Sequence, residues 1–170
     1  NVVRKPSLRE KIFDSSIPPM HVTAQEYAEM LNQLKKRAFS RRNIPMHTVI
    51  DCEFGGGDFT PKGMMSLPAP MGFGNFGDLD LIRRSFAALG RQLKAIGIDW
   101  IHSPVVDVNV NRSNPEIYIR SYGENAKIVT DCARATVLGL NDSKVIGCLK
   151  HYPGRGGAAR GEGARDDAFL

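Results

Sequence analysis

The sequence has no apolar run near the roughly 20 residues that a membrane-spanning helix needs, so we expect no membrane helix. It has only three cysteines, Cys52, Cys132 and Cys148, and no C-x-x-C pair. Three thiols cannot all pair within one chain, and their spacing is not that of a zinc site. We therefore expect free thiols, and neither a disulfide scaffold nor a metal centre. The first ten residues are polar and lack the apolar centre of a secretory leader, which favours a cytoplasmic location.

Composition is that of an ordinary globular protein, with 170 residues, 42% hydrophobic and 24% charged. This length suffices for one domain with a sizeable core. The formal net charge is +5 and the pI is about 9.3, which raises the question of nucleic-acid binding. The basic residues are spread over several separate segments, as on solvated helix faces. We therefore do not expect nucleic acid as a partner on charge alone.

Three segments show helical periodicity. The first follows a capping box at Thr23–Glu26, in which the two side chains satisfy the free amides of a helix start, and it should end at Asn43 and Pro45. The second has apolar residues at steps of three and four from Leu79 to Ile96. The third runs from Ile128 to near Gly139.

Three apolar stretches alternate with these helices and predict strands at 47–51, 98–108 and 144–150. Helix and strand in alternation predict an α/β fold with a parallel sheet whose strands are buried on both faces. Each strand ends in polar residues, and parallel strands present their carboxyl ends at one edge, where ligands bind. The polar residues at these ends are Asp51, Glu53, Asp107, Lys150 and His151.

The chain divides into an irregular segment at 1–22, one domain at 23–157, and a Gly-, Arg- and Asp-rich loop or truncated tail at 158–170. A loop of about 25 residues at 53–77 is long for a compact domain, and loops of this length are often functional.

Five stretches resemble the N-terminal domain of glycoside hydrolase family 3, in the family's order and spacing. They are IPMHTVIDCEFGGG, SLPAPMGFGN, GIDWIHSPVVDVN, PEIYIRSYGEN and CLKHYPGRG. The resemblance implies a parallel (β/α)8 TIM-type barrel, of which this chain is roughly the N-terminal half. It also implies a rim that binds the sugar at the non-reducing end of a glycan.

Matching the motifs residue by residue implies four substrate-binding residues: Asp51, Arg120, Lys150 and His151. Their chemistry suits this role, because a carboxylate accepts hydrogen bonds from sugar hydroxyls while Arg and Lys donate hydrogen bonds to the remaining oxygens. Asp51 could instead cap a turn, Arg120 could form a surface ion pair, and Lys150–His151 could be a solvated strand end.

Two carboxylates carry weaker signals. Asp107 is equally consistent with turn capping and with a functional role, and Glu53 could orient an Arg or Lys beside the substrate. The histidines at positions 21, 47 and 102 match no functional residue of the motifs and are expected to be ordinary core or surface residues.

The resemblance implies a retaining β-glycosidase of the β-N-acetylhexosaminidase or β-glucosidase type that needs no cofactor. Its nucleophile is an aspartate expected downstream of this chain, so no catalytic residue is assigned here. The acid/base histidine of the N-acetylglucosaminidase branch has no counterpart after CLKHYPGRG; the carboxylates there are Glu162, Asp166 and Asp167.

Two other functions stay open. One is a non-catalytic relative that only binds glycans. The other is an RNA-binding module, because PGRGGAARGEGAR is similar to RGG-type tracts. A half-barrel would expose sheet edges, so a second half-barrel or a C-terminal domain is an expected partner, beside the carbohydrate itself.

Overall fold

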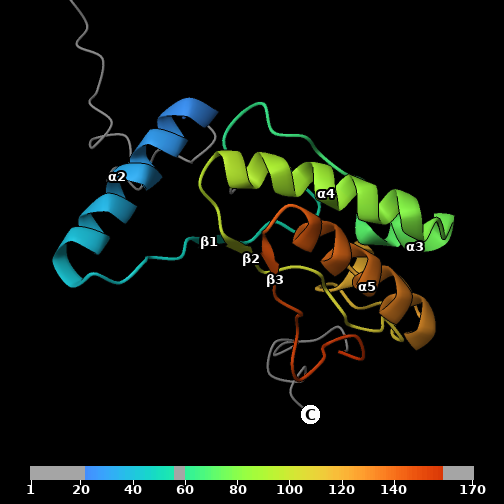
Figure 1. Cartoon of the computed structure of the whole chain (residues 1–170). Coiled ribbons are helices and arrows are strands. Elements are labelled where there is room, and N and C mark those ends of the chain that lie inside the picture. Colours follow the sequence, from blue (N-terminus) through green and yellow to red (C-terminus); the bar gives the residue numbers. More distant parts are fainter. Residues whose placement is uncertain (1–21, 56–59, 159–170) are drawn as a thin grey trace, which may run out of the picture.

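The structure is a computed structural model that describes residues 22–55 and 60–158. The predicted irregular segment at 1–22 and the predicted tail at 158–170 lie outside the described residues, apart from Val22 and Ala158. The three predicted helices and three predicted strands are present in the predicted order, and a further short helix and a 3-10 helix lie between them (Figure 1).

Helix α2 (Ala24–Arg42) begins at the predicted capping box. The Thr23 side chain accepts from the Glu26 amide, and the Glu26 carboxylate accepts from the Thr23 amide at 3.0 Å. The helix ends at Asn43, which adopts the left-handed conformation. Lys35 ties α2 to the segment before the second strand, donating to the Asp99 carboxylate at 2.5 Å and to the Gly97 carbonyl at 2.7 Å.

The sheet consists of three parallel strands in chain order, β1 (Val49–Ile50), β2 (Trp100–Ile101) and β3 (Ile146–Gly147). The parallel α/β class is therefore confirmed, but the strands are shorter than predicted. The 98–108 stretch is interrupted at Pro104, which has no N–H to donate to a neighbour. Pairing resumes beyond it as a single bridge between Val105 and Lys150.

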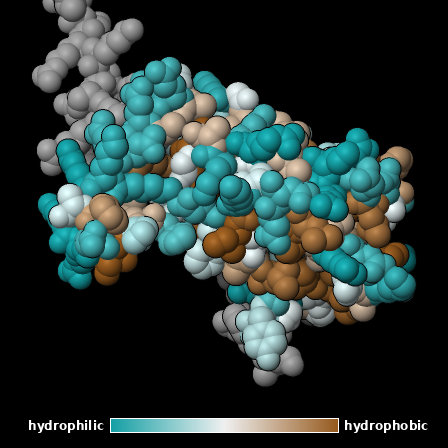
Figure 2. Space-filling view, in the orientation of Figure 1, coloured by the Kyte–Doolittle hydropathy of each residue, from teal (hydrophilic) through white to brown (hydrophobic). Residues whose placement is uncertain are grey.

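The two faces of the sheet differ, and the prediction that the strands are buried on both faces is wrong for the described residues. Ile101 is fully buried, and a Cβ on its neighbour Gly147 would meet side chains of the last helix. On the opposite face Val49 is 42% exposed and Ile146 is 52% exposed. Because side chains alternate along a strand, one face packs on helices and the other is open. Figure 2 shows hydrophobic residues reaching the surface over α5 and the sheet.

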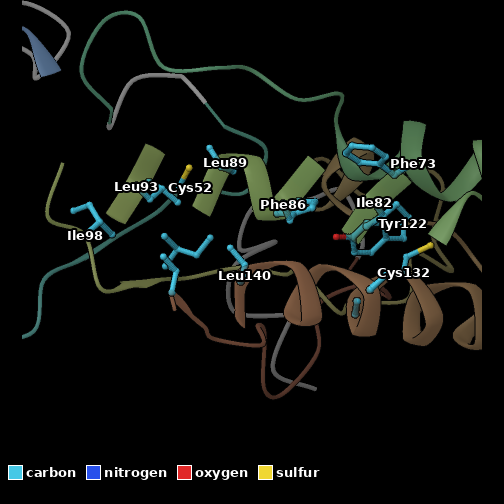
Figure 3. Close-up of a cluster of buried hydrophobic side chains, with 14 of the residues drawn as sticks. Cys52, Phe73, Ile82, Phe86, Leu89, Leu93, Ile98, Tyr122, Cys132 and Leu140 are labelled. Atoms are coloured by element: carbon cyan, nitrogen blue, oxygen red, sulfur yellow. The ribbon is translucent and has the colours of Figure 1, made fainter. Parts of the chain in front are cut away.

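Helices α4 (Leu79–Ala95) and α5 (Ala126–Asp142) pack side by side against the buried face and form most of the core with it (Figure 3). Ile82, Phe86, Leu89 and Leu93 of α4 are all fully buried. Gly139 does not end the third helix as predicted. It lies inside α5, where an added Cβ would stand 2.2 Å from the Arg83 carbonyl oxygen of α4, so its missing side chain permits the close helix contact.

The stretch at 53–77, predicted to be a loop, contains a short helix, α3 (Pro70–Phe76). Pro70 opens the helix at a position where its missing N–H costs nothing, and Gly77 closes it in the left-handed conformation. Phe73 packs against Phe86 with ring centroids 6.0 Å apart. This helix is held mainly by tertiary packing, which the local sequence does not reveal.

Candidate functional site

Four charged side chains from distant parts of the chain meet beyond the carboxyl ends of the strands. Asp51 and Glu53 follow β1, Arg120 ends the short 3-10 helix η2 (Tyr118–Arg120), and Lys150 follows β3. We call these four residues the rim cluster. All of them were predicted from the sequence as site residues, and the structure brings them into direct contact.

Lys150 lies at the centre of the rim cluster. Its Nζ is 2.7 Å from Asp51 Oδ1 and 2.7 Å from Glu53 Oε1, so it bridges the two carboxylates. The Lys150 side chain is 16% exposed, whereas that of Asp51 is 50% exposed. Asp51 therefore presents a fixed carboxylate to the surroundings, while the ammonium group behind it is largely shielded from water.

Glu53 forms the buried side of the rim cluster. Both of its oxygens accept from Arg120, with Oε2 2.8 Å from Nε and Oε1 2.7 Å from Nη2, in the two-pronged geometry typical of strong guanidinium–carboxylate pairs. Arg120 also donates to the Glu116 carbonyl at 2.8 Å. Because both oxygens of Glu53 are paired with cations, Glu53 holds the side chains of Arg120 and Lys150 in place.

The charges of the rim cluster shift the acidities of its members. The hydrogen bond from Lys150 holds the pKa of Asp51 below its usual value. Burial acts to raise the pKa of Glu53, but the hydrogen bonds from Arg120 and Lys150 outweigh it, and the pKa is lowered. The hydrogen bond to Glu53 in turn raises the pKa of Arg120. At neutral pH the rim cluster therefore holds two anions and two cations.

His151 lies beside the rim cluster and is held by Asp107. The ring Nδ1 is 2.7 Å from Asp107 Oδ2, and the His151 backbone amide donates to the same oxygen at 3.1 Å. The side chain of Asp107 has no exposed surface, while that of His151 is 16% exposed. Of these two predicted residues, His151 is the one whose side chain reaches the surface.

One residue at this edge was not predicted as part of the site. His102 follows β2, and its Nδ1 lies 3.6 Å from Asp51 Oδ1. Val49 pairs with Trp100 in the sheet register, which brings Asp51 and His102, each two residues further on, to the same open face. The stretch GIDWIHSPVVDVN contains His102 but assigns it no role, and the strand register is the signal that could have found it.

The site offers hydrogen-bonding groups of both kinds and no metal cage. Within residues 22–55 and 60–158, no group of three His, Cys, Asp or Glu side chains is arranged to hold a metal ion. Among the same residues, no helix is both long enough and apolar enough to cross a membrane. A half-exposed carboxylate beside Arg, Lys and His suits a neutral ligand rich in hydroxyl groups, such as a sugar.

The described part of the Gly- and Arg-rich tract belongs to the same structure. Arg155 donates its amide to Asp107 Oδ1, and its guanidinium contacts the Glu116 carboxylate. Asn114 Nδ2 donates to the Arg155 carbonyl at 2.6 Å. This arginine is therefore built into the fold beside the site. The other carboxylates considered above, Glu162, Asp166 and Asp167, lie outside the described residues.

Comparison with known proteins gives one consistent result. The family model described as "Glycosyl hydrolase family 3 N terminal domain" matches residues 14–167. Beta-hexosaminidase A of Pseudoalteromonas piscicida is 34% identical over 126 residues, which are 69% of this chain and 20% of that protein. A beta-N-acetylglucosaminidase/beta-glucosidase of Cellulomonas fimi is 28% identical over 135 residues, or 79% of this chain and 23% of that protein.

Solved structures agree with these matches. A family 3 beta-N-acetylglucosaminidase from Paenibacillus sp. str. FPU-7 superposes with a TM-score of 0.78 at 31% identity, covering 82% of this chain and 27% of that one. The beta-glucoside phosphorylase BglX superposes with a TM-score of 0.74 at 25% identity, covering 81% of this chain and 24% of that one. The chain thus spans about a quarter of the length of each of these four relatives.

Proposed function

Because the chain belongs to glycosyl hydrolase family 3, we propose that it is the sugar-binding part of a retaining β-glycosidase acting at the non-reducing end of β-linked sugars. The observation that carries this proposal is the rim cluster, in which Lys150 fixes a half-exposed Asp51 carboxylate beside Arg120. The carboxylate would accept hydrogen bonds from two sugar hydroxyls. The cations would donate hydrogen bonds to the remaining sugar oxygens, and hydrogen bonds to sugar hydroxyls strengthen in the transition state of such reactions.

The roles of the rim cluster follow from its contacts. Asp51 and His151, whose side chains reach the surface, would touch the sugar. Arg120 and Lys150 would donate to it from positions that Glu53 fixes. Hydrolysis also needs a nucleophile and an acid/base on either side of the glycosidic bond. We propose that the nucleophile, an aspartate, is supplied by polypeptide outside these 170 residues.

The open face of the sheet indicates where that polypeptide would lie. Val49 and Ile146 are exposed there, and among the described strands β1 and β3 each pair on one side only. We propose that further parallel strands cover this face and complete the barrel, either in a longer form of the chain or in a second polypeptide. The rim cluster would then lie at the mouth of a closed barrel, where such folds bind substrates.

The substrate class is proposed from the relatives. Their names include beta-hexosaminidase, beta-N-acetylglucosaminidase and beta-glucosidase, so the candidates are β-N-acetylhexosaminides and β-glucosides. One structural neighbour is named as a beta-glucoside phosphorylase, so inorganic phosphate belongs in the assay as an alternative acceptor to water.

The test uses the protein as its own cells make it, with aryl β-N-acetylglucosaminide and aryl β-glucoside as substrates, each with and without phosphate. We expect turnover of at least one. In Asp51→Asn, sugar affinity should fall about tenfold to a hundredfold, since a hydrogen bond to a charged group contributes about 1.5–3 kcal/mol.

Asp131→Asn is the matched control, because Asp131 forms an exposed pair with Lys127 on the surface of α5. Its sugar affinity should equal that of the wild type. Sugar binding without turnover on any substrate would contradict the enzymatic proposal and favour a glycan-binding relative. If Asp51→Asn bound sugar like the control, the proposed site would be wrong. RNA binding that weakens steeply with salt would instead support the RNA-binding alternative.

A further inference from the structure

Asp107 is the most completely enclosed carboxylate near the site. Its side chain has no exposed surface, and both of its oxygens accept hydrogen bonds within the protein. Oδ2 receives the His151 amide at 3.1 Å and contacts the His151 ring at 2.7 Å, while Oδ1 receives the Arg155 amide. Because no part of this carboxylate is exposed, it offers no surface to a substrate, and its effect on the site passes through its neighbours.

The neighbour whose side chain Asp107 contacts directly is His151. An ionised carboxylate only accepts hydrogen bonds, so the ring nitrogen that faces it must carry a proton. That nitrogen is Nδ1. In the neutral ring the other nitrogen, Nε2, then carries a lone pair, and it points away from Asp107 because the two nitrogens lie on different sides of the ring. The contact with Asp107 thus decides both the ring's orientation and the atom it offers to a ligand.

We propose that Asp107 is the positioning residue for His151, and that it keeps the proton on Nδ1 so that Nε2 meets the substrate as a hydrogen-bond acceptor. This inference rests on the function proposed above. It gives Asp107 a role that differs both from turn capping and from direct contact with the substrate. Nε2 would accept a hydrogen bond from one sugar hydroxyl, in addition to those that Asp51 accepts.

A purely structural role is the competing explanation, because Asp107 also holds the backbone of the turn at 151–155 through two amides. Loss of that anchor would disturb Lys150 and Arg155 as well as His151. The two roles differ in one respect: a positioning residue acts only through His151, whereas a turn anchor acts with or without the imidazole.

The first experiment measures the ring nitrogens directly. The natural protein is labelled with 15N-histidine, and the His151 signals are identified by their loss in His151→Gln. We expect the neutral ring to carry its proton on Nδ1 in the wild type, and this population to fall in Asp107→Asn, whose amide can donate to Nδ1. A wild-type His151 protonated on Nε2 alone would overturn the proposal, whether or not any variant folds.

The second experiment is a double-mutant cycle on sugar affinity and kcat/KM. Asp107→Asn should lose about tenfold to a hundredfold, the range known for residues that orient a functional histidine at metal sites. His151→Gln should lower sugar affinity and kcat/KM by a similar factor. In the double variant both values should lie within about twofold of those of His151→Gln. Losses that multiply would show that Asp107 acts independently of the imidazole, and would refute the proposal.

Asp99→Asn is the control for general destabilisation. Asp99 is another largely buried carboxylate, held by Lys35, Lys94 and the Thr48 amide away from the rim cluster. The Asp99→Asn substitution should destabilise the fold and leave sugar affinity unchanged. If Asp51→Asn and His151→Gln both kept full affinity, the proposed function would fail, while the proton position on His151 would still be measured. If Asp51→Asn and His151→Gln lost affinity as expected, but the losses from Asp107→Asn and His151→Gln multiplied in the double variant, the inference about Asp107 would fail and the proposed function would stand.

Discussion

Replacement of Glu53 by Gln tests the electrostatic arrangement of the site most directly. The substitution keeps the size of the side chain and removes the charge that faces Arg120 and Lys150. Removing one partner of a buried ion pair costs about 3–5 kcal/mol, because the other charge stays buried and unpaired. Arg120 is 27% exposed, and Lys150 keeps its contact with Asp51, so the cost here should be smaller. We expect Glu53→Gln to lower the free energy of unfolding by about 2–4 kcal/mol at pH 7.

Urea denaturation of both proteins at several pH values measures this loss. Burial raises the pKa of Glu53, the cationic hydrogen bonds outweigh that effect, and the folded-state pKa lies below the unfolded value of about 4.3. The stabilisation is therefore fully present above about pH 5 and disappears as the pH falls through the lowered folded-state pKa. The difference between wild type and variant should be constant near neutral pH and shrink in acid.

The matched control is Glu124→Gln, which removes the partner of Arg112 in a pair that is mostly exposed, with Arg112 at 83% and Glu124 at 51%. Exposed pairs contribute little, so its loss should be much smaller than that of Glu53→Gln. Equal losses in the two variants would refute the view that Glu53 holds two shielded cations. A difference in unfolding free energy between wild type and Glu53→Gln that grows in acid would refute the same view.

Two further predictions concern the packing behind the site. Gly139→Ala places a methyl group against the Arg83 carbonyl and should destabilise the protein by about 1–3 kcal/mol in urea; Gly72→Ala, which meets only the Pro68 side chain at 3.5 Å, is the control and should cost less. Burial raises the pKa of Cys52 to about 11, so its thiol should not react in the folded protein at pH 8. When a charged thiol reagent is added and the modified residues are identified by peptide mapping, the partly exposed Cys148 should react first, and Cys52 only after denaturant is added. Rapid labelling of Cys52 in the folded protein would contradict its burial in the core.

The sequence predicted best those features that depend on local signals. Helix α4 carries an apolar residue every three or four positions, and α2 carries a complete capping box, so both could be located from the amino-acid pattern alone. Helix α3 has neither signal. Its sequence, PMGFGNF, contains two glycines and a proline, and it holds its shape because Phe73 is buried and Gly74 lies against the Tyr122 backbone. No local pattern encodes that contact.

In the site, too, the sequence predicted single residues but not the tertiary contacts between them. The motifs pointed to Asp51, Arg120, Lys150 and His151 one at a time, but not to the contacts among them. Glu53 and Arg120 are 67 residues apart in the chain, and only the fold brings them within hydrogen-bonding distance. His102 was missed because its position depends on the pairing of β1 with β2, which no short motif records.

The strand order β1-β2-β3 has a consequence for synthesis. Each described strand pairs with the one that precedes it in the chain, so the sheet grows at a single edge as the ribosome releases the polypeptide. Among the described strands β1 forms first, and its other edge has no partner among them. During translation this edge, with the exposed Val49 beside it, can pair with another nascent chain until a further strand covers it. Slower synthesis of the polypeptide that covers this edge should therefore increase aggregation through β1.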